Sequence, residues 1–205
     1  MKKSIHQFLF SFALIASTVS SVAQTQIQDT FDIVLNGFTE AGYMGCTANI
    51  DINPTWDKNP KTGPLCYRIE FLNSCQAGWA GVYWTNRTDD TGANWGQYPG
   101  TNLKDYKRLT FWAKSESERS IVELGIGGID NTLKEPEKYK YKDSILKTYT
   151  TEGKVVILNK EWRKFTIDLT NSDLSSMIGG FFWSANWRAN PTGLVFYLDN
   201  IQFEK

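Results

Sequence analysis

Histidine is almost absent from the 205-residue sequence, in which His6 is the only one. His6 lies in an N-terminal segment that we expect to be removed on export. The mature chain would then have no Ser–His or Cys–His nucleophile pair, no histidine general base and no imidazole ligand for zinc or copper. Any catalysis would have to rest on carboxylates, Tyr, Lys, Arg or a metal ion held by oxygen atoms.

Long apolar runs are also lacking. Residues 8–16 are apolar and follow the positive charges of Lys2 and Lys3, but they fall well short of the roughly 20 residues that a membrane-spanning helix needs. Small residues then lead to Ser21-Val22-Ala23, a sequence that suits a signal peptidase. We therefore predict a signal peptide over residues 1–23, one mature domain over residues 24–205, no membrane span, and a secreted or periplasmic location.

The sequence has no excess of basic charge. It contains 22 basic and 22 acidic residues, and the loss of Lys2 and Lys3 leaves the mature chain slightly acidic. Because nucleic-acid binding draws on a concentrated basic surface, no nucleic-acid partner is expected. We expect a monomer.

Helical periodicity is nearly absent, and ten short runs rich in β-branched and aromatic residues recur between Gly, Pro, Asn and Asp. In the segment from Tyr67 to Phe71 the apolar side chains alternate with Arg68 and Glu70, as in a sheet with one buried face. The predicted fold class is all-β: a two-sheet antiparallel β-sandwich, or jelly roll. The predicted strands are residues 31–35, 48–52, 66–72, 79–84, 108–114, 121–126, 154–158, 164–169, 180–184 and 194–203. Two long polar connections, residues 85–106 and 127–148, are typical places for binding residues.

Only three cysteines occur, Cys46, Cys66 and Cys75. In an oxidising compartment two of them are expected to pair. Cys66 and Cys75 flank one predicted strand, which would hold them too far apart for a bridge. Cys46 is therefore the expected shared partner, and Cys66 is slightly favoured over Cys75 as the other half of the disulfide.

Aromatic residues are abundant, and the tryptophans gather in residues 78–84, 94–96 and 181–187 beside Asn, Gln and Arg. An aromatic ring can cover the apolar face of a sugar while polar side chains bond its hydroxyl groups. This composition favours a polysaccharide or oligosaccharide as the partner. The candidate ligand-binding residues are Trp79, Tyr83, Trp84, Asn94, Trp95, Trp183, Trp187 and Arg188.

Burial in the core is the alternative interpretation for each tryptophan, because sandwich cores are themselves rich in aromatic residues. Trp112, within an otherwise apolar run, is more typical of a structural residue. Trp95 is surrounded by Asn, Gly and Thr, so a ligand-binding or loop-anchoring role is favoured there.

Carboxylates offer a second function. A glycoside hydrolase needs two of them roughly 5 to 10 Å apart, and Glu70 and Glu123 both occupy polar-face positions of predicted strands. They are the candidate catalytic pair if the protein is a small secreted hydrolase or lyase, although a solvated strand face explains both without catalysis. A non-catalytic binder is the leading hypothesis, the enzyme is the alternative, and an adhesion module that recognises protein is a third.

An Asp199-Asn200 step interrupts the apolar last strand. Oxygen ligands at such a position suit a structural calcium ion, with Asp29 and Asp51 as further candidate ligands. The alternative is a simple β-bulge.

The same residues carry a family resemblance. The ending from Phe196 to Glu204 resembles the last strand of the galactose-binding-like jelly rolls that include many carbohydrate-binding modules. Further similar segments, in order, are residues 42–45, 78–84, 94–96, 109–113, 127–129, 143–144, 161–162 and 167–169. The resemblance covers nearly the whole mature chain.

The resemblance implies a ligand site on the concave sheet or in the edge loops, and a calcium ion near Asp199. One departure matters: in the group's pattern the Gly-Tyr-Met-Gly of residues 42–45 is usually followed by Asp, whereas Cys46 follows here. Because the fold hosts binders and enzymes alike, it does not choose between them.

Overall fold

The structure is a computed structural model that describes residues 30–72, 75–86, 88–89, 92–130, 139–149 and 155–205. The predicted signal peptide and Asp29 lie outside the described residues. Among the described residues, no helix has the length and apolar character needed to cross a membrane.

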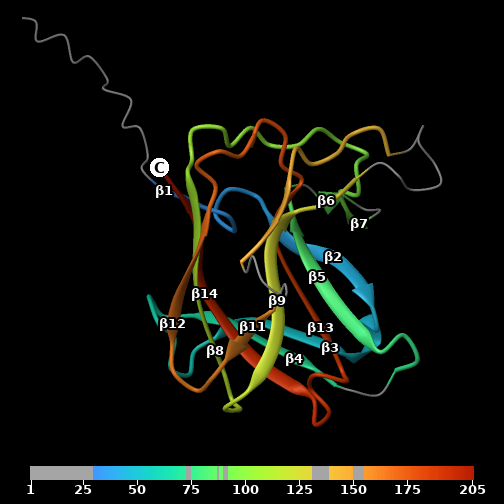
Figure 1. Ribbon diagram of the computed structural model, residues 1–205, viewed down its shortest axis with the longest axis vertical. Coiled ribbons are helices and arrows are strands. Elements are labelled where there is room, and N and C mark those ends of the chain that lie inside the picture. Colours follow the sequence, from blue (N-terminus) through green and yellow to red (C-terminus); the bar gives the residue numbers. More distant parts are fainter. Residues whose placement is uncertain (1–29, 73–74, 87, 90–91, 131–138, 150–154) are drawn as a thin grey trace, which may run out of the picture.

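Two antiparallel six-stranded sheets form the molecule, which confirms the predicted β-sandwich (Figure 1). The first sheet has the order β12-β8-β14-β4-β3, with β1 paired to β14. Its strands are β1 (Thr30–Asp32), β3 (Ile50–Trp56), β4 (Cys66–Phe71), β8 (Arg108–Ser115), β12 (Arg163–Asp168) and β14 (Leu194–Glu204).

The second sheet has the order β10-β9-β13-β5-β2, with β11 paired to β9. Its strands are β2 (Thr39–Gly45), β5 (Trp79–Thr85), β9 (Ser120–Gly127), β10 (Leu146–Thr148), β11 (Val156–Leu158) and β13 (Gly179–Asn186). A separate hairpin joins β6 (Thr88–Asp89) to β7 (Gly92–Ala93), and a 3-10 turn covers Thr47–Asn49.

Period-two alternation explains why these segments are strands. On β4, Ile69 and Phe71 are buried in the core, while Arg68 and Glu70 lie on the other side and form an ion pair of 2.9 Å. Each sheet in this way turns one apolar side toward the other sheet, and its other side faces outward. The two outer faces therefore lie on opposite sides of the molecule.

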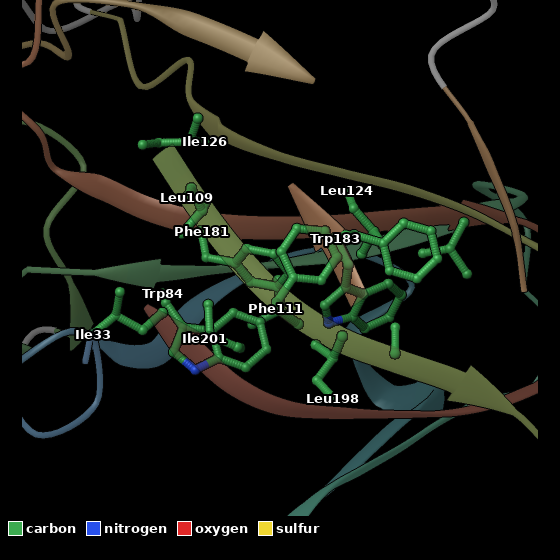
Figure 2. Close-up of a cluster of buried hydrophobic side chains, with 14 of the residues drawn as sticks. Ile33, Trp84, Leu109, Phe111, Leu124, Ile126, Phe181, Trp183, Leu198 and Ile201 are labelled. Carbon is green, nitrogen blue, oxygen red and sulfur yellow. The ribbon is translucent and has the colours of Figure 1, made fainter. Parts of the chain in front are cut away.

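The space between the sheets is filled mainly by aromatic and branched aliphatic side chains. Figure 2 shows Trp84 and Trp183 among Phe111, Leu124 and Leu198, which come from both sheets. The Phe111 ring stacks on Phe165 and meets Phe181 edge-on, at centroid distances of 5.5 and 5.1 Å. Such edge-on and stacked ring contacts stabilise the core in addition to the burial of apolar area.

The sequence did not predict β2. Its residues include Gly42 and Gly45, and a register shift between Glu40 and Gly42 breaks the alternation. A strand with glycine and a bulge has no clean apolar period, so only its pairing with β5 reveals it.

The disulfide joins Cys46 to Cys75, with a Cα–Cα distance of 5.9 Å, and Cys66 is a buried free thiol. The prediction of a Cys46–Cys66 bridge was therefore wrong. Cys46 follows β2 of the second sheet, and its amide donates to the carbonyl oxygen of Trp79 at the start of β5. Cys75 shortly precedes β5, so pairing of β2 with β5 brings Cys46 to Cys75, whereas Cys66 begins β4 of the first sheet.

Candidate functional site

The outer face of strands β2, β5, β13 and β9 carries the candidate site, and we call it the open face. On β5, Ala80, Val82 and Trp84 point into the main core, so Trp79 and Tyr83 must point outward. Cross-strand pairing places the other outward residues in rows: Asn186 beside Trp79, Met44 and Ser184 beside Gly81, Glu123 beside Ser184, and Gly42 and Phe182 beside Tyr83.

A small apolar cluster lies on the open face, separate from the main core. Tyr83 and Phe182 form it with Ile129 and Ile178, and their two rings have a centroid distance of 5.0 Å. Burial raises the pKa of the Tyr83 hydroxyl, and nearby acidic groups add to the shift. At neutral pH Tyr83 is therefore a neutral aromatic side chain.

Trp95 packs onto this cluster from the loop after β7. Its ring meets Tyr83 edge-on, with centroids 6.0 Å apart and planes at 82°. Gly42 makes the approach possible, because a Cβ atom there would lie 3.2 Å from the Trp95 ring and 2.7 Å from the Tyr83 Cβ. The Trp95 amide donates to the side chain of Gln97 at 2.6 Å.

Two cavities open on this face. One, of about 440 Å³, is lined by Met44, Tyr83, Gly128 and Ile129 with Trp95, Asp130 and Tyr139. The second, of about 170 Å³, is lined by Trp79, Ile121, Glu123, Val155, Ser184, Ala185 and Asn186. Between them lies the row of Met44, Gly81 and Ser184, in which a Cβ atom on Gly81 would meet the Ser184 Cβ at 3.1 Å and the Met44 Cε at 3.3 Å. Gly81, without a side chain, thus lies between the two cavities, with the Met44 and Ser184 side chains against it.

The end of the open face is marked by Trp79 and Trp187, each 41% exposed. Trp187 follows β13, and its amide donates to the carbonyl oxygen of Gly78 at 3.0 Å. Arg188 is exposed beside it. Asn186, also exposed, accepts the Ala189 amide and pairs with Trp79 across the strands.

Two acidic groups set the electrostatics of the site. Glu123 is half-buried on β9 and accepts a hydrogen bond of 2.9 Å from the Ser184 hydroxyl. Asp143 is buried under the adjoining loops and accepts from the amides of Ile129, Ile178 and Gly179. Burial raises the pKa of Asp143 to about 6, although these three donors act in the opposite direction.

Three of the predicted ligand residues are not exposed on the open face. Trp84 and Trp183 are fully buried in the main core, so their assignment to a ligand was wrong. Trp84 lies five residues from the outward Trp79 and therefore on the opposite face of β5. Trp183 lies beside the outward Phe182 and is directed inward for the same reason.

Asn94 was also assigned wrongly, because its side chain is buried and bonded within its own loop. It donates to the Asn86 side chain and the Tyr98 carbonyl oxygen, and it accepts from the amides of Gly96 and Tyr98. These bonds shape the loop that carries Trp95. Asn94 is a positioning residue.

The proposed catalytic pair is ruled out. Glu70 points outward from the first sheet, and Glu123 points outward from the second. Two residues on opposite sides of a sandwich cannot flank one glycosidic bond. The sequence showed correctly that both are polar-face residues, but alternation along a strand does not reveal which sheet the strand joins.

Asp199 does not fit the role of a calcium ligand in this arrangement. One carboxylate oxygen accepts from the amides of Lys61 and Thr62, and the other from the Thr62 hydroxyl. Both oxygens thus face hydrogen-bond donors, whereas a calcium ion needs free oxygen lone pairs. Asp51 pairs with Glu70 across β3 and β4. Among the described residues, no three His, Cys, Asp or Glu side chains gather as metal ligands.

A second aromatic group, which the sequence did not reveal, lies on the outer face of the first sheet. The Tyr197 ring lies 6.3 Å from both Trp56 and Trp162, and the Lys114 ammonium lies over the rings of Trp162 and Tyr197. The indole N–H groups of Trp56 and Trp162 donate to backbone carbonyls of residues 58 and 59. Trp112 has Lys61 over its ring at 4.3 Å. Lysine ammonium groups and backbone carbonyls of the protein therefore already contact these rings and their indole N–H groups.

Met44, Phe182 and Ser184 are site residues that the sequence analysis missed. Met44 lies on the unpredicted strand β2, and Phe182 and Ser184 alternate with buried residues on β13. The alternation of residues 181–186 was the available signal, since it separates Phe182 and Ser184 from Trp183.

No known family model matches the sequence, and no curated protein is significantly similar to it. The structure, however, is similar to solved structures. The family 30 carbohydrate-binding module of a cellulosomal cellulase of Clostridium thermocellum has a TM-score of 0.55, with 13% identity over 86% of this chain and 97% of that one. The family 11 module of another cellulosomal cellulase of Clostridium thermocellum has a TM-score of 0.51, with 14% identity over 85% and 92%.

An exo-β-agarase structure matches with a TM-score of 0.50 and 11% identity, over 85% of this chain and 24% of that one. At these identities the likeness concerns the fold. The chain has the jelly-roll fold of carbohydrate-binding modules.

Proposed function

We propose that the protein is exported and binds an oligosaccharide or polysaccharide chain on the open face. The observation that carries the proposal is the placement of Trp79 and Trp95, both accessible in part, at two cavities of one sheet face. Their rings offer apolar surface for the C–H faces of sugar rings. The other outer face has no such free rings among its described residues, because Lys, Arg and backbone groups occupy them.

The spacing of the site suits a chain rather than a single sugar. Trp79 and Tyr83 lie four residues apart on β5, which corresponds to about 13 Å along the strand. Ser184, beside Gly81, and Asn186, beside Trp79, offer hydroxyl and amide groups that can bond sugar hydroxyls. The glycan would therefore run along β5 and β13, from Trp79 to Trp95.

Two further observations support the proposal. The fold is that of the carbohydrate-binding modules of families 11 and 30 described above. The sequence begins with the pattern of a signal peptide, as expected for a protein that meets extracellular polysaccharides.

Affinity gel electrophoresis of the mature chain in gels that contain plant, algal and microbial polysaccharides tests the proposal. We expect at least one polysaccharide to retard the protein, and Trp79→Ala and Trp95→Ala each to weaken binding by about tenfold or more, as for a tryptophan hot spot. Trp56→Ala on the other outer face is the matched control and should leave the retardation unchanged. No retardation in any gel, or equal loss in Trp56→Ala, would overturn the proposal.

The same panel separates binding from catalysis. Incubation with each retarding polysaccharide, followed by assay of reducing ends and of absorbance from unsaturated products, should give no product. Product that is formed by the purified protein would show an enzyme whose catalytic residues are other than Glu70 with Glu123.

A further inference from the structure

We propose that Asp143 is a positioning residue of the saccharide site, because it holds the walls of the cavity that Trp95 and Tyr83 line. We call this cavity of about 440 Å³ the Trp95 cavity. The inference rests on the proposed function and adds to it a residue that acts on the site from behind. Asp143 is 8% exposed and is not part of the lining of the Trp95 cavity, so it would shape the site without touching the saccharide.

One wall of the Trp95 cavity is the chain that follows β9, and it is bonded to Asp143 twice. The Ile129 amide donates to the Oδ2 atom of Asp143 at 2.8 Å, and the Asp143 amide donates to the Ile129 carbonyl oxygen at 2.8 Å. The backbone bond resembles those that join paired strands, and the carboxylate adds a second bond to the same residue. Ile129 is thereby held in its cluster with Tyr83 and Phe182.

The same carboxylate bonds the start of β13. Its Oδ1 atom accepts from the amides of Ile178 and Gly179. Gly179 lies between the carboxylate and Tyr83, because a Cβ atom there would lie 2.8 Å from the Tyr83 ring and 3.4 Å from the Oδ2 atom of Asp143. Hydrogen bonds to an ionised acceptor are stronger than those between neutral groups. One buried carboxylate thus ties the cavity wall at Ile129 to the start of β13.

The Trp95 side of the cavity is held by the chain just before Asp143. The Tyr141 amide donates to the Gly96 carbonyl oxygen at 2.9 Å, and the Tyr141 side chain packs against the same apolar cluster as Trp95. The two segments lie close together, because a Cβ atom on Gly96 would overlap the Tyr141 carbonyl oxygen. Since Tyr141 and Asp143 are two residues apart, one short segment sets the positions of both Trp95 and Ile129.

The substitution Asp143→Asn would break this arrangement with little change in size. An asparagine side chain has one acceptor oxygen and a donating NH₂ group, so it cannot accept at both ends as the carboxylate does. Either the Ile129 amide or the two amides of β13 would lose their acceptor. A saccharide that binds would then have to order the released chain, and this ordering lowers affinity.

Asp143→Asn is compared with Asp199→Asn in the mature protein. Asp199 is also buried and accepts backbone amides, but it belongs to the first sheet. Affinity electrophoresis and isothermal titration calorimetry use hydroxyethyl cellulose, arabinoxylan, laminarin and agarose, with any other polysaccharide of the wider panel that retards the wild type. We expect Asp143→Asn to weaken binding about two- to tenfold and Asp199→Asn to leave it unchanged. Circular dichroism and melting temperatures check that each variant is folded.

Double-variant cycles separate the positioning of the Trp95 cavity from a general loss of structure. In the Trp95→Ala background, Asp143→Asn should cause no further loss of binding, because the ring that it positions is gone. In the Trp79→Ala background it should weaken binding by the same factor as in the wild type, because Trp79 lines the other cavity. Gly96→Ala, which disturbs the contact with Tyr141, should follow the same pattern and tests the inference if Asp143→Asn does not fold.

The outcomes separate the two proposals. Wild-type affinity in both Asp143→Asn and Gly96→Ala, an equal loss in Asp199→Asn, or an additive loss in the Trp95→Ala background overturns the positioning role while carbohydrate binding stands. Retardation of the wild type by none of the polysaccharides removes the proposed function and this inference with it.

Discussion

The Trp95 ring stands edge-on to the Tyr83 ring, and it rests on Gly42 of β2, which has no side chain to displace it. This relationship connects the loop after β7 to the open face. It also makes the position of Trp95 dependent on a backbone contact that can be tested.

Gly42→Ala should displace Trp95 from the open face. The new Cβ atom would lie 2.7 Å from the Tyr83 Cβ, which cannot swing away because it is close to the backbone. We expect a loss of about 1–3 kcal/mol in unfolding free energy from overpacking, and weaker saccharide binding. In the double variant with Trp95→Ala, Gly42→Ala should cause no further loss of binding; an additive loss would show that it acts by another route.

Trp183→Ala and Trp79→Ala should differ sharply in stability. Trp183 is fully buried between the sheets, so its removal should cost about 3–5 kcal/mol of unfolding free energy. Trp79 is 41% exposed, and its loss should cost less than about 1 kcal/mol while it weakens saccharide binding. Urea denaturation measures both. Similar costs for the two variants would contradict the assignment of faces on β5 and β13.

Cys66 should be the free thiol of the folded protein, and it should react slowly. Burial raises the pKa of the Cys66 thiol to about 11, so little thiolate is present at pH 8. Iodoacetamide should label the folded protein slowly, and in guanidinium without reductant it should label one site per chain. Peptide mapping should place the label on Cys66 and show Cys46 linked to Cys75. A label on Cys75 would show a different bridge.

Asp143 should make the protein less stable as the pH rises from about 4 to 7. Its pKa is raised from 3.8 to about 6, so the folded state holds the proton more tightly than the unfolded state. This contribution to stability is fully present below about pH 4, falls as the pH passes 6, and amounts to about 3 kcal/mol.

Asp143→Asn isolates the effect, because all other groups titrate in both proteins. The melting temperature of the variant minus that of the wild type should be more positive at pH 7.5 than at pH 4.5. The reverse order would mean that the amide donors of Ile129, Ile178 and Gly179 outweigh burial.

Asp199→Ala should destabilise the protein through lost hydrogen bonds to residues 61 and 62. We expect a total cost of about 1–3 kcal/mol in unfolding free energy for the loss of these part-buried hydrogen bonds to a carboxylate, and the same cost with and without a calcium chelator. A chelator that lowers the melting temperature of the wild type but not of the variant would place a calcium ion at Asp199.

Much of the fold could be predicted because alternation is a local signal. Residues 66–72 and 164–169 show it clearly, and they correspond to β4 and β12 within one residue at each end. Strand β2 has no such signal, since it contains a bulge and two glycines, Gly42 against Trp95 and Tyr83 and Gly45 against Trp79. The resemblance to galactose-binding-like jelly rolls also predicted how the strands are assembled, and the solved carbohydrate-binding modules have the same fold.

The candidate site was predicted only in part. Trp79, Tyr83 and Trp95 lie at cavities of the same open face, and their role as ligand residues stays a prediction. Trp84 and Trp183 were named with them because composition does not distinguish the two faces of a strand.

The sequence alone determined that His6 is the only histidine, and it determined the period of two along most strands and the abundance of tryptophan. Tertiary structure decided which sheet each strand joined, and so it separated Glu70 from Glu123 and brought Cys75 to Cys46. The physical reason is that side-chain alternation depends on neighbouring residues in the chain, whereas strand order depends on how two apolar faces pack against each other across the whole domain.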